Sequence, residues 1–138
     1  MTQSLSKRVH REVATVTPVT SVPQIVEEMA EWDVGDVIVV DDGDIVGIVT
    51  DRDVALAMRD SPDPIAVTAD DIMTRDPITV QEEWGTARIV DELREAGVRR
   101  APVVDDEGDL VGVVSLDDIL VLLGREAGSV ADLVEEQA

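Results

Sequence analysis

The stretch Gly47-Ile48-Val49-Thr50-Asp51-Arg52-Asp53 decides the fold, because it joins the end of an apolar strand to the start of a helix. The same device returns 65 positions later as Gly112-Val113-Val114-Ser115-Leu116-Asp117-Asp118. In both stretches an apolar pair follows a glycine, a hydroxyl residue comes next, and an aspartate lies three residues further on. Each stretch also follows an acidic turn. The function must therefore account for a unit that occurs twice.

Outward from these stretches, most of the chain divides into two copies of one pattern. Residues 12–42 align with residues 76–106, and residues 43–58 align with residues 108–123, with Glu107 as a single insertion. Of the 47 aligned pairs 17 are identical, and many of the others exchange one apolar residue for another. A repeat with two copies predicts two similar units, each burying one face of a sheet and packing on the other about a pseudo-twofold axis.

The hydrophobic pattern predicts the same order of elements in each copy: a short strand, a helix, a hairpin of two strands and a second helix. Ser21 is expected to cap the first helix, with Pro23 tolerated in its first turn. The run Ser61-Pro62-Asp63-Pro64 breaks the chain between the copies. The expected elements are an extended segment from residue 15, a helix at 22–31, strands at 37–40 and 45–50, a helix at 51–59, a short capped helix at 68–73, an extended segment at 78–80, a helix at 86–95, strands at 101–104 and 110–115, a helix at 116–123 and a last short helix at 129–136.

The charge of the chain is unusual. Aspartate and glutamate number 31 against 11 lysine and arginine residues, for a formal charge of −20 at pH 7, and Lys7 is the only lysine. The composition resembles that of proteins from salt-accumulating halophiles rather than that of a merely acidic mesophilic protein. Molar salt shortens the screening length to about 3 Å and removes most of the self-repulsion. An extended nucleic-acid interface is excluded, because neutralising phosphates requires a basic surface.

Several protein classes are excluded by what the sequence lacks. Without cysteine there are no disulfides or thiolate sites, and residues 1–13 lack the apolar run of a signal peptide. No stretch approaches the roughly 20 apolar residues that span a bilayer. We therefore expect a soluble, cytoplasmic protein with no membrane partner. With His10 as the only histidine, and no P-loop or dinucleotide glycine motif, we expect no enzyme, no catalytic residue, no metal site and no cofactor.

Three motifs in the right order carry a family resemblance. The run Asp-Ile-Met-Thr-Arg-Asp-Pro-Ile-Thr-Val at 71–80, the run Gly-Val-Arg-Arg-Ala-Pro-Val-Val at 97–104, and both Gly-x-x-Thr/Ser-x-x-Asp endings look like cystathionine β-synthase (CBS) domains. Two such domains in tandem form a Bateman module. The resemblance implies an α/β fold of two β-α-β-β-α repeats. We expect the first repeat at 9–60, a linker at 61–70, the second repeat at 71–124 and a helical tail at 125–138.

The paired residues Thr50 and Asp53, and Ser115 and Asp118, have two interpretations. They form a capping box, which stabilises a helix by about 1 kcal/mol. The same geometry offers free N–H groups to a phosphate and a carboxylate to two ribose hydroxyls. In the family this aspartate is the ribose ligand, and the hydroxyl residue contacts ribose or phosphate. Both interpretations are compatible.

Arg99 and Arg100 are the second candidate, because arginine binds phosphate bidentately. The family often places a basic residue at the Arg99 position, facing the phosphates. The alternative is a surface ion pair with Asp105 or Glu95. In the first repeat the matching positions hold Gly35 and Asp36, and Ile38 replaces Pro102. That repeat therefore lacks the positive charge, unless Arg52, Arg75 or Arg100 reaches across the cleft.

Thr15 and Thr79 begin the first strand of each repeat, at the edge where family members sandwich adenine with neighbours such as Ile78 and Val98. The alternative is that these are ordinary strand and core residues. With no Phe or Tyr in the chain, adenine would rest on aliphatic side chains. Trp32 and Trp84 are expected to be packing or interface residues.

We therefore expect a regulatory module that binds AMP, ADP, ATP or S-adenosylmethionine between its repeats and signals to a protein that the sequence does not name. A ligand-independent dimerisation adaptor is the main alternative, and a small nucleotide-directed enzyme is a weaker one. The second repeat holds Thr79, Arg99, Pro102, Ser115 and Asp118, so its site is expected to bind more tightly. The family forms flat dimers, and the apolar helix residues predict a homodimer here. Those residues are Val54, Leu56, Leu120 and Leu123.

Overall fold

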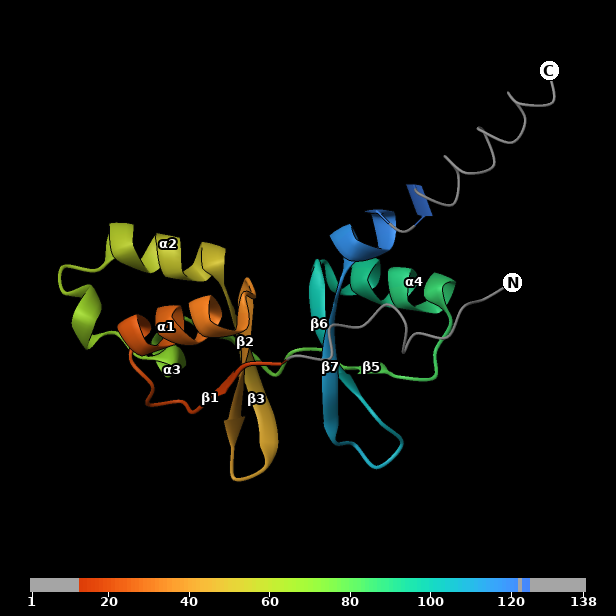
Figure 1. The fold of residues 1–138 in the computed structure, drawn as a ribbon, viewed down its shortest axis with the longest axis horizontal. Coiled ribbons are helices and arrows are strands. Elements are labelled where there is room, and N and C mark those ends of the chain that lie inside the picture. The colour runs from red at the N-terminus through yellow and green to blue at the C-terminus, as the bar shows by residue number, and fades with distance from the viewer. Residues whose placement is uncertain (1–12, 122, 125–138) are drawn as a thin grey trace, which may run out of the picture.

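The computed structural model describes residues 13–121, 123 and 124. The expected helix at 129–136 and the lead-in at 1–12 lie outside the described residues. Figure 1 shows two halves whose sheets face each other in the middle, with helices on the outer sides. The elements are β1 (Thr15–Val16), α1 (Val22–Trp32), β2 (Asp36–Asp41), β3 (Asp44–Thr50), α2 (Asp51–Asp60), the 3-10 turn η2 (Pro64–Ala66), α3 (Ala69–Ile72), β4 (Thr74–Arg75), β5 (Val80–Gln81), α4 (Thr86–Ala96), β6 (Arg100–Val104) and β7 (Leu110–Ser115). Residues 116–121 are helical and follow β7 directly.

The two sheets repeat one register, which confirms the predicted α/β fold of two packed β-α-β-β-α repeats. In each copy a short first strand pairs parallel to a central strand (β1 with β2, β5 with β6), which pairs antiparallel to the next (β3, β7). The hairpin registers shift between Val39 and Val40 and, at the aligned place, between Val103 and Val104. The hairpin turns use Gly43 at φ 84° and Gly108 at φ 86°, a region that favours glycine.

The predicted helix starts are confirmed. Ser21 caps α1 by accepting a hydrogen bond from the backbone N–H of Gln24, and Pro23 lies in the first turn. One strand is shorter than expected, since Ile78 and Thr79 precede β5 rather than belong to it.

The central strand β2 is buried on both faces, which explains its unbroken apolar sequence. Val37 and Val39 belong to a first core beneath α1, whereas Ile38 between them points to the other copy. There Ile38 and Ile48 meet Val113 of β7, so the two sheets share a small core of their own. The core of the second copy consists of Val80, Ile89, Leu93, Ala101, Val103, Val114 and Ile119.

The segment after the first repeat folds back onto that repeat. Ala69 of α3 is fully buried in the first core, and β4 pairs antiparallel with β3 through Gly47 and Ile48. The sheet of the first copy therefore has four strands, in the order β1-β2-β3-β4, although β4 follows the predicted linker. The predicted domain boundaries follow the repeat in the sequence, and they stay a prediction. In the structure, residues 69–75 pack on the first copy. Among the described residues, no helix is both long and apolar enough to cross a membrane.

Candidate functional site: two clefts between the copies

Two clefts lie where the copies meet, and each contains one hydroxyl–aspartate helix start. We call them the Asp53 cleft and the Asp118 cleft. Their cavity volumes are about 310 Å³ and 220 Å³ for the part of the chain that the structure describes. The first falls in the range of small-molecule pockets, about 300–1,000 Å³, and the second lies just below it.

The Asp53 cleft combines a helix start from the first copy with apolar and basic residues from the second. Thr50 and Asp53 face Ile78, Val98 and the two arginines at 99 and 100. The wall that the second copy contributes is therefore both apolar and basic. It is lined by Ile48, Thr50, Asp51, Arg52, Asp53, Thr74, Pro77, Ile78, Val98, Arg99 and Arg100.

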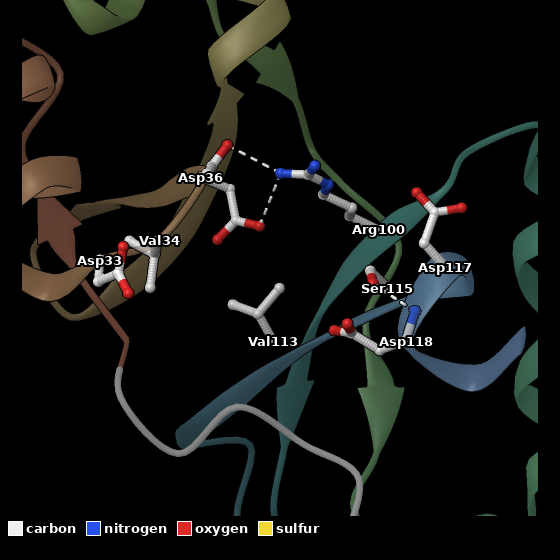
Figure 2. A pocket seen from close by; sticks show the side chains of 9 residues that line it. Asp33, Val34, Asp36, Arg100, Val113, Ser115, Asp117 and Asp118 are labelled. Atoms are coloured by element: carbon white, nitrogen blue, oxygen red, sulfur yellow. Dashed lines mark hydrogen bonds and ion pairs between the residues drawn. The ribbon is translucent and has the colours of Figure 1, made fainter. Parts of the chain in front are cut away.

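In the Asp118 cleft the two copies exchange roles: the second copy provides the helix start, which faces the end of α1 and the start of β2 in the first copy (Figure 2). Asp33 enters it because this residue ends α1 in a left-handed turn, with φ 53°. Figure 2 shows carboxylates on both sides of Val113 and the Arg100 side chain crossing above it. The described lining is Asp33, Val34, Gly35, Asp36, Arg100, Val113, Ser115, Asp117 and Asp118.

Both helix starts are capped, as the capping interpretation predicted. The backbone N–H of Asp53 donates to Thr50 Oγ1 at 3.2 Å, and the Thr50 N–H donates to Asp53 Oδ2 at 2.9 Å. The backbone N–H of Asp118 donates to Ser115 Oγ at 3.0 Å. The capping role does not exclude ligand binding, since a carboxylate has two oxygens and about four lone-pair sites.

Arg100 joins the two copies. Its Nη1 donates to the Gly35 carbonyl oxygen at 2.8 Å and to Asp36 Oδ2 at 3.2 Å, and it lines both clefts (Figure 2). Arg100 and Asp36 occupy aligned positions in the repeat, so the ion pair lies across the pseudo-twofold axis. Gly35 leaves room for it: a Cβ there would lie 3.1 Å from Arg100 Nη1. An arginine from the second copy therefore does reach the Asp53 helix start.

Arg99 lines the Asp53 cleft and makes a surface ion pair with Asp117. The alternative interpretation was a surface ion pair with Asp105 or Glu95, and the surface ion pair that forms is with Asp117 instead. The reason is that residue 99 precedes β6 beside the next helix start, where its carbonyl oxygen accepts the Leu116 N–H at 2.7 Å.

The grouping of site residues by repeat, which the sequence suggested, is not their grouping in space. Val98 and Arg99 of the second copy lie with Asp53 rather than with Asp118, so the reason for ranking the Asp118 site as the tighter one is removed. Three other candidates line neither cleft. Thr15 and Thr79 are exposed, and Pro102 is buried in β6 opposite Val113.

Several lining residues were missed by sequence reasoning. Val34 aligns with Val98, and Val113 aligns with Ile48, so the repeat alignment could have identified Val34 and Val113 as lining residues. Asp33, Thr74 and Pro77 carried none, because only the packing of the copies brings them to a cleft. Trp84 packs against the second core, and the centroid of its ring lies 3.8 Å from the Arg88 guanidinium carbon, which confirms its packing role.

Relatives of the chain are numerous. An uncharacterized protein of Methanopyrus kandleri is 35% identical over 119 residues, which cover 85% of this chain and 61% of that protein. A CBS domain-containing protein of Bacillus subtilis is 29% identical over 132 residues, 91% of each chain. The inosine-5′-monophosphate dehydrogenase of Methanocaldococcus jannaschii is 34% identical over 111 residues, but the chain spans only 21% of that enzyme.

Solved structures give the same result. A CBS domain pair in complex with 5′-methylthioadenosine and S-adenosyl-L-methionine superposes with a TM-score of 0.80 at 25% identity, covering 91% of this chain and 99% of that one. A Thermoplasma acidophilum CBS domain protein of unknown function has a TM-score of 0.75 at 28% identity, covering 86% of this chain and 68% of that one. The family model described as the CBS domain matches residues 6–60 and again residues 62–125. The chain therefore belongs to the CBS domain family and carries two of these domains in tandem.

Proposed function

We propose that this protein is a regulatory module, not an enzyme, and that it binds adenosine-containing small molecules in the clefts between its two CBS domains. One observation carries the proposal: each cleft joins a capped helix start with a carboxylate from one domain to the wall of the other domain. A similar domain pair binds 5′-methylthioadenosine and S-adenosyl-L-methionine.

The chemistry of the clefts suits a nucleoside. The carboxylates of Asp53 and Asp118 accept hydrogen bonds from two ribose hydroxyls. Aliphatic side chains such as Ile78 and Val98 cover the faces of adenine, which needs no aromatic partner for this. The N–H groups of Asp51, Arg52 and Asp53 in the first turn of α2 already donate within the protein, so an anionic group of the ligand would bind the arginines that line the Asp53 cleft.

Ligand binding would regulate by fixing the two domains relative to each other. Since each cleft takes residues from both domains, a bound ligand contacts both at once. Its affinity then depends on how the domains are placed, and a ligand shifts an equilibrium only by such a difference in affinity. The regulated partner would sense the favoured arrangement.

The proposal is tested by calorimetry with AMP, ADP, ATP and S-adenosylmethionine in molar KCl, using Asp53→Ala and Asp118→Ala. A carboxylate that accepts two ribose hydroxyls contributes about 1.5–3 kcal/mol per hydrogen bond. Each variant should therefore lose most of the affinity of its cleft. Asp71→Ala is the matched control, because Asp71 forms a capping box with Thr68 but lines neither cleft. If all three variants lower the melting temperature and none changes binding, the aspartates are caps alone.

We also propose a homodimer, in which ligand-independent association would be the adaptor function. Leu120 and Leu123 are 53% and 43% exposed, and Met58 on α2 is 58% exposed. Figure 1 places α2 and the helix after β7 on the same upper side of the molecule. Val54 and Leu56 support the dimer less than expected, because both are half-buried and Val54 packs against the first core. Ligand titration separates the adaptor from the sensor.

A further inference from the structure

The two clefts are built from aligned residues of the same repeat, yet they differ in charge at three aligned positions. The Asp53 cleft holds Arg52, Arg99 and Arg100. The aligned positions of the Asp118 cleft hold Asp117, Gly35 and Asp36. Each arginine on one side is thus matched by an aspartate or a glycine on the other.

The two clefts also differ in the total number of charged residues in their described linings. The Asp53 cleft has three arginines and two aspartates, whereas the Asp118 cleft has four aspartates and one arginine. Arg100 is common to both clefts and pairs with Asp36, which lines only the Asp118 cleft (Figure 2), whereas Arg52 and Arg99 line only the Asp53 cleft. Asp33 adds a carboxylate where the aligned residue is Gly97, which does not line the Asp53 cleft.

These charges act on the part of an adenosine compound beyond the ribose. A phosphate group carries up to two negative charges at neutral pH, so arginines attract it and carboxylates a few ångströms away repel it. A 5′-thioether carries no charge there, and a 5′-sulfonium carries a positive one. Both avoid the repulsion, and carboxylates attract the sulfonium.

We infer that the two clefts take different classes of ligand: a 5′-phosphorylated adenosine binds in the Asp53 cleft, and an uncharged or cationic 5′-sulfur derivative of adenosine binds in the Asp118 cleft. This inference rests on the proposed function and divides it between two sites. The module then reads two metabolite classes at once. Arg100 lines both clefts, so occupation of one cleft by phosphate competes for a side chain that also forms a wall of the other.

The test uses two probes that differ only at the 5′ position, AMP and 5′-methylthioadenosine, titrated by calorimetry into the full chain. The KCl concentration should be the lowest at which the protein stays folded, because salt screens the charges that separate the ligands. Asp53→Asn should weaken the binding of AMP by about tenfold or more and the binding of 5′-methylthioadenosine by less than about twofold. Asp118→Asn should give the reciprocal result.

Two further variants separate charge from ribose contact and from helix capping. Arg52→Asp leaves the two aspartates that bind ribose intact. It should weaken the binding of AMP several-fold without changing the affinity for 5′-methylthioadenosine. Asp71→Asn, in the capping box outside the clefts, should change neither. If both probes lose affinity in the same variant, or equally in both, adenosine binding stands and the division between clefts is overturned. If the wild-type chain binds neither probe, the proposed function fails with it.

Discussion

Replacing Arg100 by methionine would remove the charged link between the two CBS domains while keeping the length of its apolar stem. Arg100 lies across the pseudo-twofold axis from Asp36 and also donates to the Gly35 carbonyl oxygen. Its side chain is only 27% exposed and that of Asp36 only 15%. The ion pair is therefore shielded from water more than an ordinary surface pair.

The size of the effect follows from these contacts. A hydrogen bond to a charged group contributes about 1.5–3 kcal/mol. Partial exposure of Arg100 reduces this value, and the Gly35 carbonyl oxygen keeps its bond from the Asp51 N–H at 2.9 Å. We expect Arg100→Met to lower the free energy of unfolding by about 1–2 kcal/mol.

The measurement is urea denaturation at constant KCl, with Arg59→Met as the matched control. Arg59 pairs with Asp60, but their side chains are 70% and 61% exposed. Such a pair contributes little, so the control should leave the urea midpoint almost unchanged. A double-mutant cycle of Arg100→Met with Asp36→Asn should give a coupling energy of about 1 kcal/mol. Equal midpoints for Arg100→Met and Arg59→Met, or no coupling, would refute the view that this pair holds the domains together.

Three further predictions concern the packing, the charge and the assembly. Gly47→Ala would place a Cβ 2.4 Å from Met73 Sδ and 3.0 Å from Met73 Cβ, so it should lower the free energy of unfolding, measured by urea denaturation, by about 1–3 kcal/mol. Adding Met73→Ala should recover part of this loss, and an unchanged midpoint for Gly47→Ala would contradict the packing. With a net charge of −20, the melting temperature should rise from low to molar KCl, and a constant value would exclude the halophile interpretation. Light scattering in high salt should give about twice the chain mass of 14.9 kDa, and Leu120→Asp should reduce it, whereas a monomeric wild type would rule out the dimer.

Much of the fold was predictable, because β-branched runs, capping residues and the repeat all gave the same answer. The apolar run from Val37 to Val40 predicted a strand, and the structure buries it on both faces. The same pattern in the second copy predicted the second hairpin. The assignment of residues to clefts was not predictable in the same way. Val98 and Arg99 belong to the second copy, and they share a cleft with the Asp53 helix start of the first copy only because the copies pack face to face. Local pattern identifies site residues, whereas tertiary packing decides which of them share a site.

The return of β4 to the first sheet has a consequence for how such a module can be divided. Cutting the chain after residue 60 would remove β4 and buried Ala69 together, and would leave β3 with an open strand edge. Open edges pair with other chains and promote aggregation. The smallest transferable piece is therefore longer than one repeat. A gene fusion that ends at the sequence boundary has an incomplete first sheet, whereas one that includes the pair has all four strands of that sheet.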